Sequence, residues 1–121
     1  MLTVYTVPIS LYCAKLRIVL RHKRLKWEEK SPIGGYGSDE YKTIVPTGNL
    51  PALVDGDLLI ADSEAIAEYL EEICPTPAML PASPAARAKT REIGRFHDTR
   101  LEPALRKLFK ALSSKNQDHT L

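Results

Sequence analysis

Two apolar runs joined by Asp55-Gly56 constrain the fold of this chain more than any other feature of its sequence. The runs occupy residues 51–54 and 57–60. Two residues of the Asp-Gly type between such runs are the strongest short-range signal for a β-hairpin, whose two strands are antiparallel. A helix is predicted to begin directly afterwards, at Asp62, because apolar residues then recur at helical spacing. This part of the chain is therefore predicted to form strand, strand and helix.

The N-terminal residues predict a different order of elements. Residues 2–6 predict a buried strand, Ser10 opens a helix, and residues 26–30 predict a second strand. A strand–helix–strand unit requires a parallel crossover, so the complete sheet should be mixed. The glycine-rich segment 32–37 lacks the Lys-Ser/Thr ending of a phosphate-binding loop, and we interpret it as a connection. The whole order predicts an α/β thioredoxin-like domain with a mixed four-stranded sheet, βαβ followed by ββα.

The amino-acid composition changes after the last predicted helix of this domain. Residues 79–84 are rich in Pro, Ala and Ser and are predicted to form a linker. A long helix is predicted from about Ala85, with a kink at Pro103. Its predicted buried side consists of Ile93, Phe96, Leu101, Leu105, Leu108 and Phe109. We therefore divide the chain into a thioredoxin-like domain (1–78), the linker, and the start of an all-α domain (85–121).

Charge and cysteine content exclude several classes of protein. The 121 residues include 17 Lys and Arg against 15 Asp and Glu, and the net charge of +2 gives no reason to expect a nucleic-acid partner. The basic run Arg21–Arg24 falls at the end of a predicted helix, where cations interact favourably with the helix dipole. Two cysteines are too few for a disulfide scaffold, and no apolar stretch approaches the length of about 20 residues that spans a bilayer. We therefore expect a cytoplasmic protein without membrane association.

Three segments are candidates for a functional site, and the first lies at the start of the first predicted helix. Ser10 or Cys13 would meet unpaired backbone N–H groups there, and the positive end of the helix would stabilise a thiolate. The alternative is that Ser10 only caps the helix and Cys13 packs inside it. These residues alone leave both interpretations open.

The other two segments precede the hairpin and the helix that follows it. Pro51, at the first position of a strand, could carry a cis bond that would leave the backbone of Leu50 free to pair with an extended peptide. Asp62 and Ser63 begin a helix whose free N–H groups bind carboxylates, while Asp62 could pair with an ammonium group. The alternatives are an ordinary trans bond before Pro51 and an ordinary acidic helix cap at Asp62.

A ligand with a central thiol, a peptide backbone and a terminal amino-acid group would satisfy all three segments, and glutathione has those parts. The segments PISLYCAKLRIVLRHKRL, VPTGNLPALVDG and ADSEAIAEYLEE resemble the N-terminal domain of cytosolic glutathione S-transferases. The resemblance covers about residues 2–80 and is greatest to the bacterial and theta- or zeta-like members that use serine. The stretch RFHDTRLEPAL is similar to the first helix of the family's all-helical C-terminal domain.

The resemblance implies a role for each residue of the candidate site. Leu50 would pair its backbone with the cysteinyl part of glutathione, ahead of a cis Pro51. Asp62 and Ser63 would hold the γ-glutamyl end, with Ser63 on its carboxylate. Asn49 would lie near the glycyl end. Glutathione would serve as co-substrate, with no metal.

The resemblance also implies that Ser10 is the catalytic residue, which hydrogen-bonds the sulfur of glutathione. Two other residues compete for this role. Tyr5 stands near the place where tyrosine-using members carry their hydroxyl, but we interpret it as a strand residue. Cys13 would form a mixed disulfide in a cysteine-using member. Those members place the thiol at the Ser10 position, so we interpret Cys13 as a half-buried neighbour.

The implied function is that of a glutathione S-transferase, which activates the thiolate of glutathione for attack on a small electrophile. The resemblance further implies a homodimer active in detoxification, in which Asp98 would reach the neighbouring subunit's glutathione. One alternative is a non-catalytic glutathione-binding or protein-interaction module. A glutaredoxin-like oxidoreductase is a weaker alternative, because Ser10 stands where its nucleophilic cysteine would be. Members normally continue through further helices that build the electrophile pocket, so we expect a fragment or a short variant. The sequence does not identify the electrophile.

Overall fold

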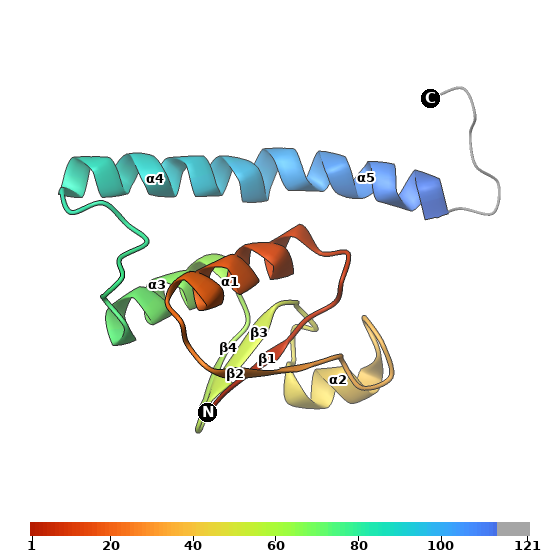
Figure 1. Ribbon diagram of the computed structural model, residues 1–121. Helices are drawn as coiled ribbons and strands as arrows, with labels where there is room; N and C mark the ends of the chain where they lie inside the picture. The colour runs from red at the N-terminus through yellow and green to blue at the C-terminus, as the bar shows by residue number, and fades with distance from the viewer. Residues whose placement is uncertain (114–121) are drawn as a thin grey trace. The chain divides into compact units, whose positions relative to one another are not determined.

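The structure, a computed structural model that describes residues 1–113, places a four-stranded sheet and three helices in a first unit, Met1–Leu80 (Figure 1). In chain order its elements are β1 (Leu2–Tyr5), α1 (Leu11–His22), β2 (Trp27–Lys30), α2 (Asp39–Ile44), β3 (Ala52–Asp55), β4 (Leu58–Ile60) and α3 (Ser63–Ile73). A second unit begins at Pro81. None of the helices in the described part of the chain is long and apolar enough to cross a membrane.

The sheet is mixed, as predicted, with the strand order β2-β1-β3-β4. β1 and β2 are parallel, whereas β3 is antiparallel to both β1 and β4. Helix α1 makes the crossover between the two parallel strands, and the hairpin adds the antiparallel pair. The βαβ and ββα halves of a thioredoxin-like domain are therefore confirmed.

The hairpin between β3 and β4 is present, but its loop lies one residue further along than predicted. Asp55 pairs with Leu58, so the two loop residues are Gly56 and Asp57 rather than Asp55 and Gly56. Gly56 has a φ of 60°. A glycine at the first loop position suits a type II′ turn, which needs a positive φ only there. The turn type thus keeps Asp55 inside the strand ladder.

Successive strand residues face opposite sides of the sheet, and each side has its own core. Helices α1 and α3 cover one face, and α2 lies on the other (Figure 1). The core under α1 and α3 consists of Leu2, Val4, Leu16, Val19, Leu20, Leu53, Ile66 and Leu70. The core against α2 consists of Tyr5, Tyr41, Val45 and Ala52. Val4 and Tyr5 are neighbours in sequence yet lie in different cores, as the two-residue period of a strand requires.

The end of α1 corrects the interpretation of the basic run Arg21–Arg24. Lys23 is only 4% exposed, whereas the other three members of the run are exposed. Lys23 follows Leu16 and Val19 at helical spacing, so its side chain lies on the buried stripe of the helix. Arg24 takes a φ of 56° just after the helix, the left-handed position that most often holds glycine. The helix dipole therefore explains the exposed cations and not Lys23.

The second unit is helical, with a change of helix type in its middle. It contains α4 (Pro84–Phe96), a π-helical segment η1 (His97–Leu101) and α5 (Glu102–Ser113). Pro103 has no N–H to donate to the preceding turn, and its ring crowds a carbonyl there. The structure has a wider π-helical turn, η1, just before Pro103. The kink at Pro103 stays a prediction. Residues 114–121, the end of the predicted second domain, lie outside the described residues.

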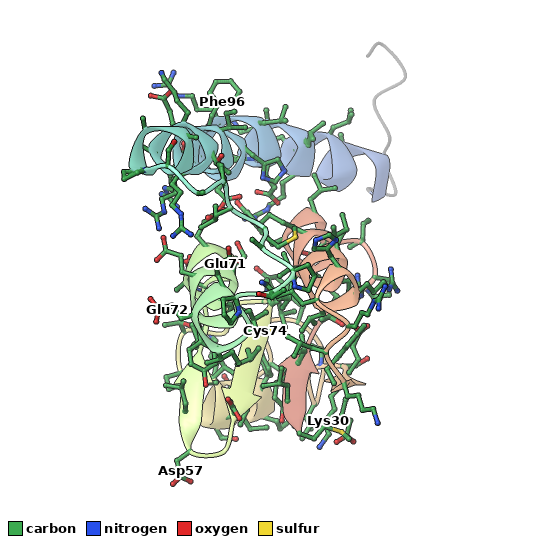
Figure 2. All side chains as sticks on the ribbon, turned by 60° about the vertical axis from the view of Figure 1, so that its left-hand side comes forward. Lys30, Asp57, Glu71, Glu72, Cys74 and Phe96 are labelled. Carbon is green, nitrogen blue, oxygen red and sulfur yellow. The ribbon has the colours of Figure 1, made fainter. Side chains whose placement is uncertain are left out.

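Most members of the side of this helix that we predict to be buried are exposed in the single chain. Ile93, Phe96, Leu101 and Leu108 are exposed by 45–70%, and Figure 2 shows Phe96 projecting from α4. The side chain of Phe109 lies outside the described residues. One continuous helix has one amphipathic stripe, and residues 81–113 contain no further element of the same unit to cover it.

Candidate functional site

The register of the sheet brings the three predicted segments to one end of it. Tyr5 at the end of β1 pairs with Ala52 at the start of β3, and Leu53 pairs with Ile60 at the end of β4. The loop after β1, the segment before β3 and the segment after β4 therefore leave the sheet at the same end. Asp57, labelled in Figure 2 at the hairpin turn, marks the opposite end.

Ser10 lies in the first of these segments and caps α1. Its Oγ accepts a hydrogen bond from the Cys13 N–H at 3.2 Å, so the cap that the alternative interpretation named is present. A hydroxyl has one donor and two acceptor sites, and this bond uses only an acceptor site. The half-buried Ser10 hydroxyl is thus able to donate its proton to an anionic atom at the positive end of the helix.

The two residues that compete with Ser10 are both buried. Tyr5 belongs to β1, is 8% exposed and packs its ring 5.6 Å from that of Tyr41. Its interpretation as a strand residue is confirmed. Cys13 is a free cysteine that is 0% exposed, so the prediction that it is half-buried is wrong. Cys13 lies on the stripe of α1 that faces inward, which removes its thiol from solvent.

The second segment contains a cis bond between Leu50 and Pro51, as predicted. Pro51 is buried and Leu50 is half-buried. Within residues 1–113, no hydrogen bond involves the N–H or the C=O of Leu50. A donor and an acceptor of the main chain are therefore available at this position, next to the first residue of β3.

Asn49 holds this segment in place through two hydrogen bonds. Its C=O accepts from the Tyr41 hydroxyl at 2.7 Å, and its Nδ2 donates to the Ala61 C=O at 3.1 Å. Burial raises the pKa of Tyr41, which keeps the phenol protonated as the donor. Asn49 thus joins the segment before β3 to the one after β4, and its contact with a glycyl group stays a prediction.

The third segment begins α3, as predicted. Asp62 is the N-cap, and its Oδ2 accepts from the Ala65 N–H at 2.9 Å. Ser63, the first residue of the helix, is 7% exposed. The contact of Asp62 is that of an ordinary cap. The roles of Asp62 and Ser63 toward a γ-glutamyl group stay predictions.

Sequence reasoning missed two ion pairs that join α1 to α3. Lys15 Nζ lies 2.6 Å from Glu64 Oε1, and Lys23 Nζ lies 2.7 Å from Glu71 Oε1. The partners are 49 and 48 residues apart in sequence. Because Lys23 is a cation on the apolar stripe of α1, the sequence could have indicated that it has a buried partner. The neighbouring sequence does not identify that partner. Among the described residues, no group of His, Cys, Asp and Glu side chains is placed to hold a metal ion.

The Lys23–Glu71 pair also fixes the chain that follows α3. Figure 2 labels Glu71, in α3, and Cys74, directly after it. Lys23 Nζ donates to the carbonyls of Cys74 at 2.5 Å and Pro77 at 2.9 Å. Glu71 accepts from the backbone N–H groups of residues 79 and 80, at 3.0 and 3.2 Å. Burial acts to raise the pKa of Glu71, but the hydrogen bonds from Lys23 and these N–H groups outweigh it and lower the pKa.

The sequence matches a known family model over most of the first unit. That model describes the N-terminal domain of glutathione S-transferase and matches residues 4–78. Among curated relatives, the stringent starvation protein A homolog of Pasteurella multocida (strain Pm70) is 37% identical over 90 residues, which cover 74% of this chain and 42% of that protein. The probable maleylacetoacetate isomerase 1 of Drosophila melanogaster is 40% identical over 86 residues, which cover 65% of this chain and 35% of that protein. The chain spans less than half the length of these relatives.

A comparison with solved structures agrees with the sequence. The holo structure of a maleyl pyruvate isomerase, described as a bacterial glutathione S-transferase of the zeta class, superposes with a TM-score of 0.79 at 30% identity. The match covers 93% of this chain and 57% of that chain. The family resemblance seen in three sequence segments is thus confirmed in sequence and in fold.

Proposed function

The chain belongs to the glutathione S-transferase family, and from this premise we propose that its first unit binds glutathione and activates the thiol for attack on a small electrophile. The observation that carries the proposal is the hydroxyl of Ser10. It caps α1 with an acceptor site and so keeps its O–H free at a helix N-terminus. A thiolate placed there would receive a hydrogen bond from Ser10 and the field of the helix.

The tripeptide shape of glutathione suits the other two segments. The unpaired N–H and C=O of Leu50 would bind the backbone of the cysteinyl residue, in the manner of a short added strand. Ser63 and the free N–H groups of α3 would hold the γ-glutamyl carboxylate, and Asp62 would face the ammonium group. Asn49 would lie near the glycyl end. The shared end of the sheet supports a single ligand across all of these groups.

The proposed chemistry needs a thiolate at neutral pH. A free thiol has a pKa of about 8.5, and one hydrogen bond to a charged sulfur is worth roughly 1.5–3 kcal/mol, enough to lower the pKa by about one to two units. The helix end would add about 0.3–1 kcal/mol. The thiol proton passes to solvent, Ser10 keeps its own proton, and the sulfur electron pair forms the bond to the electrophilic atom. The maleyl pyruvate isomerase match supports an enzyme that uses glutathione as co-substrate.

The same proposal extends to the organisation of the protein. Residues 1–78 would be the glutathione-binding domain, 79–84 the linker and 85–121 the start of the helical domain. The protein would act in detoxification as a cytoplasmic homodimer, with Asp98 near the partner subunit's glutathione. Family membership is the support for each of these points.

A second candidate function is a non-catalytic glutathione-binding or protein-interaction module. It is favoured by relatives named stringent starvation protein A homolog, a name that states no reaction. Turnover separates the two candidates. A transferase would consume a chromogenic aryl halide together with glutathione, whereas a module would bind glutathione and leave the rate at background.

The first test is calorimetric titration of glutathione into the protein and its Ser63→Ala variant. Loss of a hydrogen bond to a carboxylate should weaken binding by about tenfold or more. Ser83→Ala is the matched control, because Ser83 Oγ caps α4 by accepting from the Ala86 N–H at 3.1 Å in the other unit. Equal effects of the two variants, or no binding by the folded wild-type protein, would contradict the proposed site.

A further inference from the structure

Helices α1 and α3 are joined by two ion pairs of the same polarity, each with the lysine on α1 and the glutamate on α3. The pairs are Lys15–Glu64 and Lys23–Glu71, and they lie about two helical turns apart along each helix. The helices therefore run side by side in the same direction. Their N-termini, which carry Ser10 and Ser63, face the same end of the unit.

The two pairs differ in burial, and this separates their roles. The side chains of Lys23 and Glu71 are 0% and 9% exposed, and the pair holds the chain that follows α3. The side chains of Lys15 and Glu64 are 29% and 23% exposed. A partly exposed pair contributes little to stability, because water screens the charges. The Lys15–Glu64 pair is therefore expected to contribute little to the stability of the first unit.

The position of Glu64 indicates a role in ligand binding instead. It follows Ser63 directly and lies in the first turn of α3, where a carboxylate stabilises the helix dipole. The proposed function brings a second carboxylate, from the γ-glutamyl group, to the same helix end. Two carboxylates at one helix end repel each other unless a cation compensates one of them. The ammonium of Lys15, 2.6 Å from Glu64 Oε1, provides that compensation.

We propose that Lys15 is a positioning residue for an anionic ligand group, because it neutralises Glu64 and so keeps the N-terminus of α3 attractive to a carboxylate. The inference rests on the proposed function, since it assigns that carboxylate to the γ-glutamyl end of glutathione. Lys15 acts through Glu64 and need not touch the ligand. The two partners of the pair then have opposite effects on binding, which a purely structural ion pair would not have.

The test measures glutathione affinity by calorimetry for three variants. Lys15→Met leaves Glu64 unpaired and should weaken binding by about tenfold. Glu64→Gln removes the repelling charge and should leave affinity unchanged or higher. The double variant Lys15→Met/Glu64→Gln should return to within about twofold of the wild type. Glu29→Gln, which breaks the Arg17–Glu29 pair between α1 and β2 with an N···O distance of 3.1 Å, is the control and should not change affinity.

A modified ligand isolates the charge that the inference concerns. With a glutathione analogue whose γ-glutamyl carboxylate is an amide, Lys15→Met should lose its effect. Equal losses for Lys15→Met and Glu64→Gln, no recovery in the double variant, or the same loss with both ligands would each overturn the inference and leave the proposed function intact. A folded wild-type protein that does not bind glutathione would overturn both. Urea unfolding of each variant establishes that it is folded.

Discussion

Breaking the buried Lys23–Glu71 pair from one side should strongly destabilise the first unit, and replacing Lys23 by Met tests this. The change removes the ammonium and leaves the carboxylate of the buried Glu71 with only backbone N–H groups as partners. It also leaves the carbonyls of Cys74 and Pro77 without their donor. Breaking a buried pair from one side costs about 3–5 kcal/mol. Since domains of this kind are stable by about 5–15 kcal/mol, Lys23→Met should remove a large fraction of the stability.

Urea unfolding followed by tryptophan fluorescence measures the loss. Trp27 is the single tryptophan of the sequence and lies in β2, so its signal reports on the first unit. With a slope of about 1–3 kcal/mol per molar urea, the midpoint should fall by roughly 2 M. Lys26→Met is the matched control, because Lys26 is exposed just after the same helix, and it should change stability by less than about 0.5 kcal/mol.

A double variant identifies the cause of the loss. Lys23→Met with Glu71→Leu removes both charges and should recover much of the stability, because a buried pair can be replaced by apolar side chains of similar volume. A loss below about 1 kcal/mol for Lys23→Met would refute the reasoning. A double variant as unstable as the single one would show that lost packing, and not an unpaired carboxylate, accounts for the effect.

Three further predictions concern pH, backbone conformation and catalysis. The folded state lowers the pKa of Glu71 below its ordinary value of 4.5. The stability that this carboxylate contributes is therefore present above pH 4.5 and is lost as the pH falls through the lower folded pKa. Glu71→Gln should make stability, measured by urea unfolding, depend less on pH in the acid range. Arg24→Gly should raise stability by about 0.5–1 kcal/mol, because a left-handed φ of 56° costs an L-residue more than glycine loses in entropy, and an unchanged or lower unfolding midpoint would contradict this. Ser10→Ala should lower kcat/KM by about 10- to 100-fold while Ser10→Thr restores it, because threonine keeps the hydroxyl; equal rates for both in a steady-state assay would exclude the donor role.

Sequence alone predicted the features whose causes lie within a few residues. Ser10 and Asp62 accept hydrogen bonds from N–H groups three residues ahead, so their caps depend only on local sequence. Residues 2–6 predicted the first strand, and the order of elements predicted the mixed topology of the sheet. The three candidate segments, and the family resemblance that they carry, were likewise available from the sequence. The ligand roles of their residues remain predictions.

Tertiary structure decided what depends on distant residues or on the exact phase of an element. The pairing of Asp55 with Leu58 shifted the hairpin loop by one residue, because the turn type and not the dipeptide sets the register. The partners of Lys15 and Lys23 lie on another helix, and only the packing of α1 against α3 selects them. Hydrophobic periodicity gives a helix an apolar face but does not say what covers it, and most of the apolar face predicted for α4 and α5 is exposed in the single chain. The sequence therefore determined the helix caps and the three candidate segments, and the sheet register determined that these segments share one end of the unit.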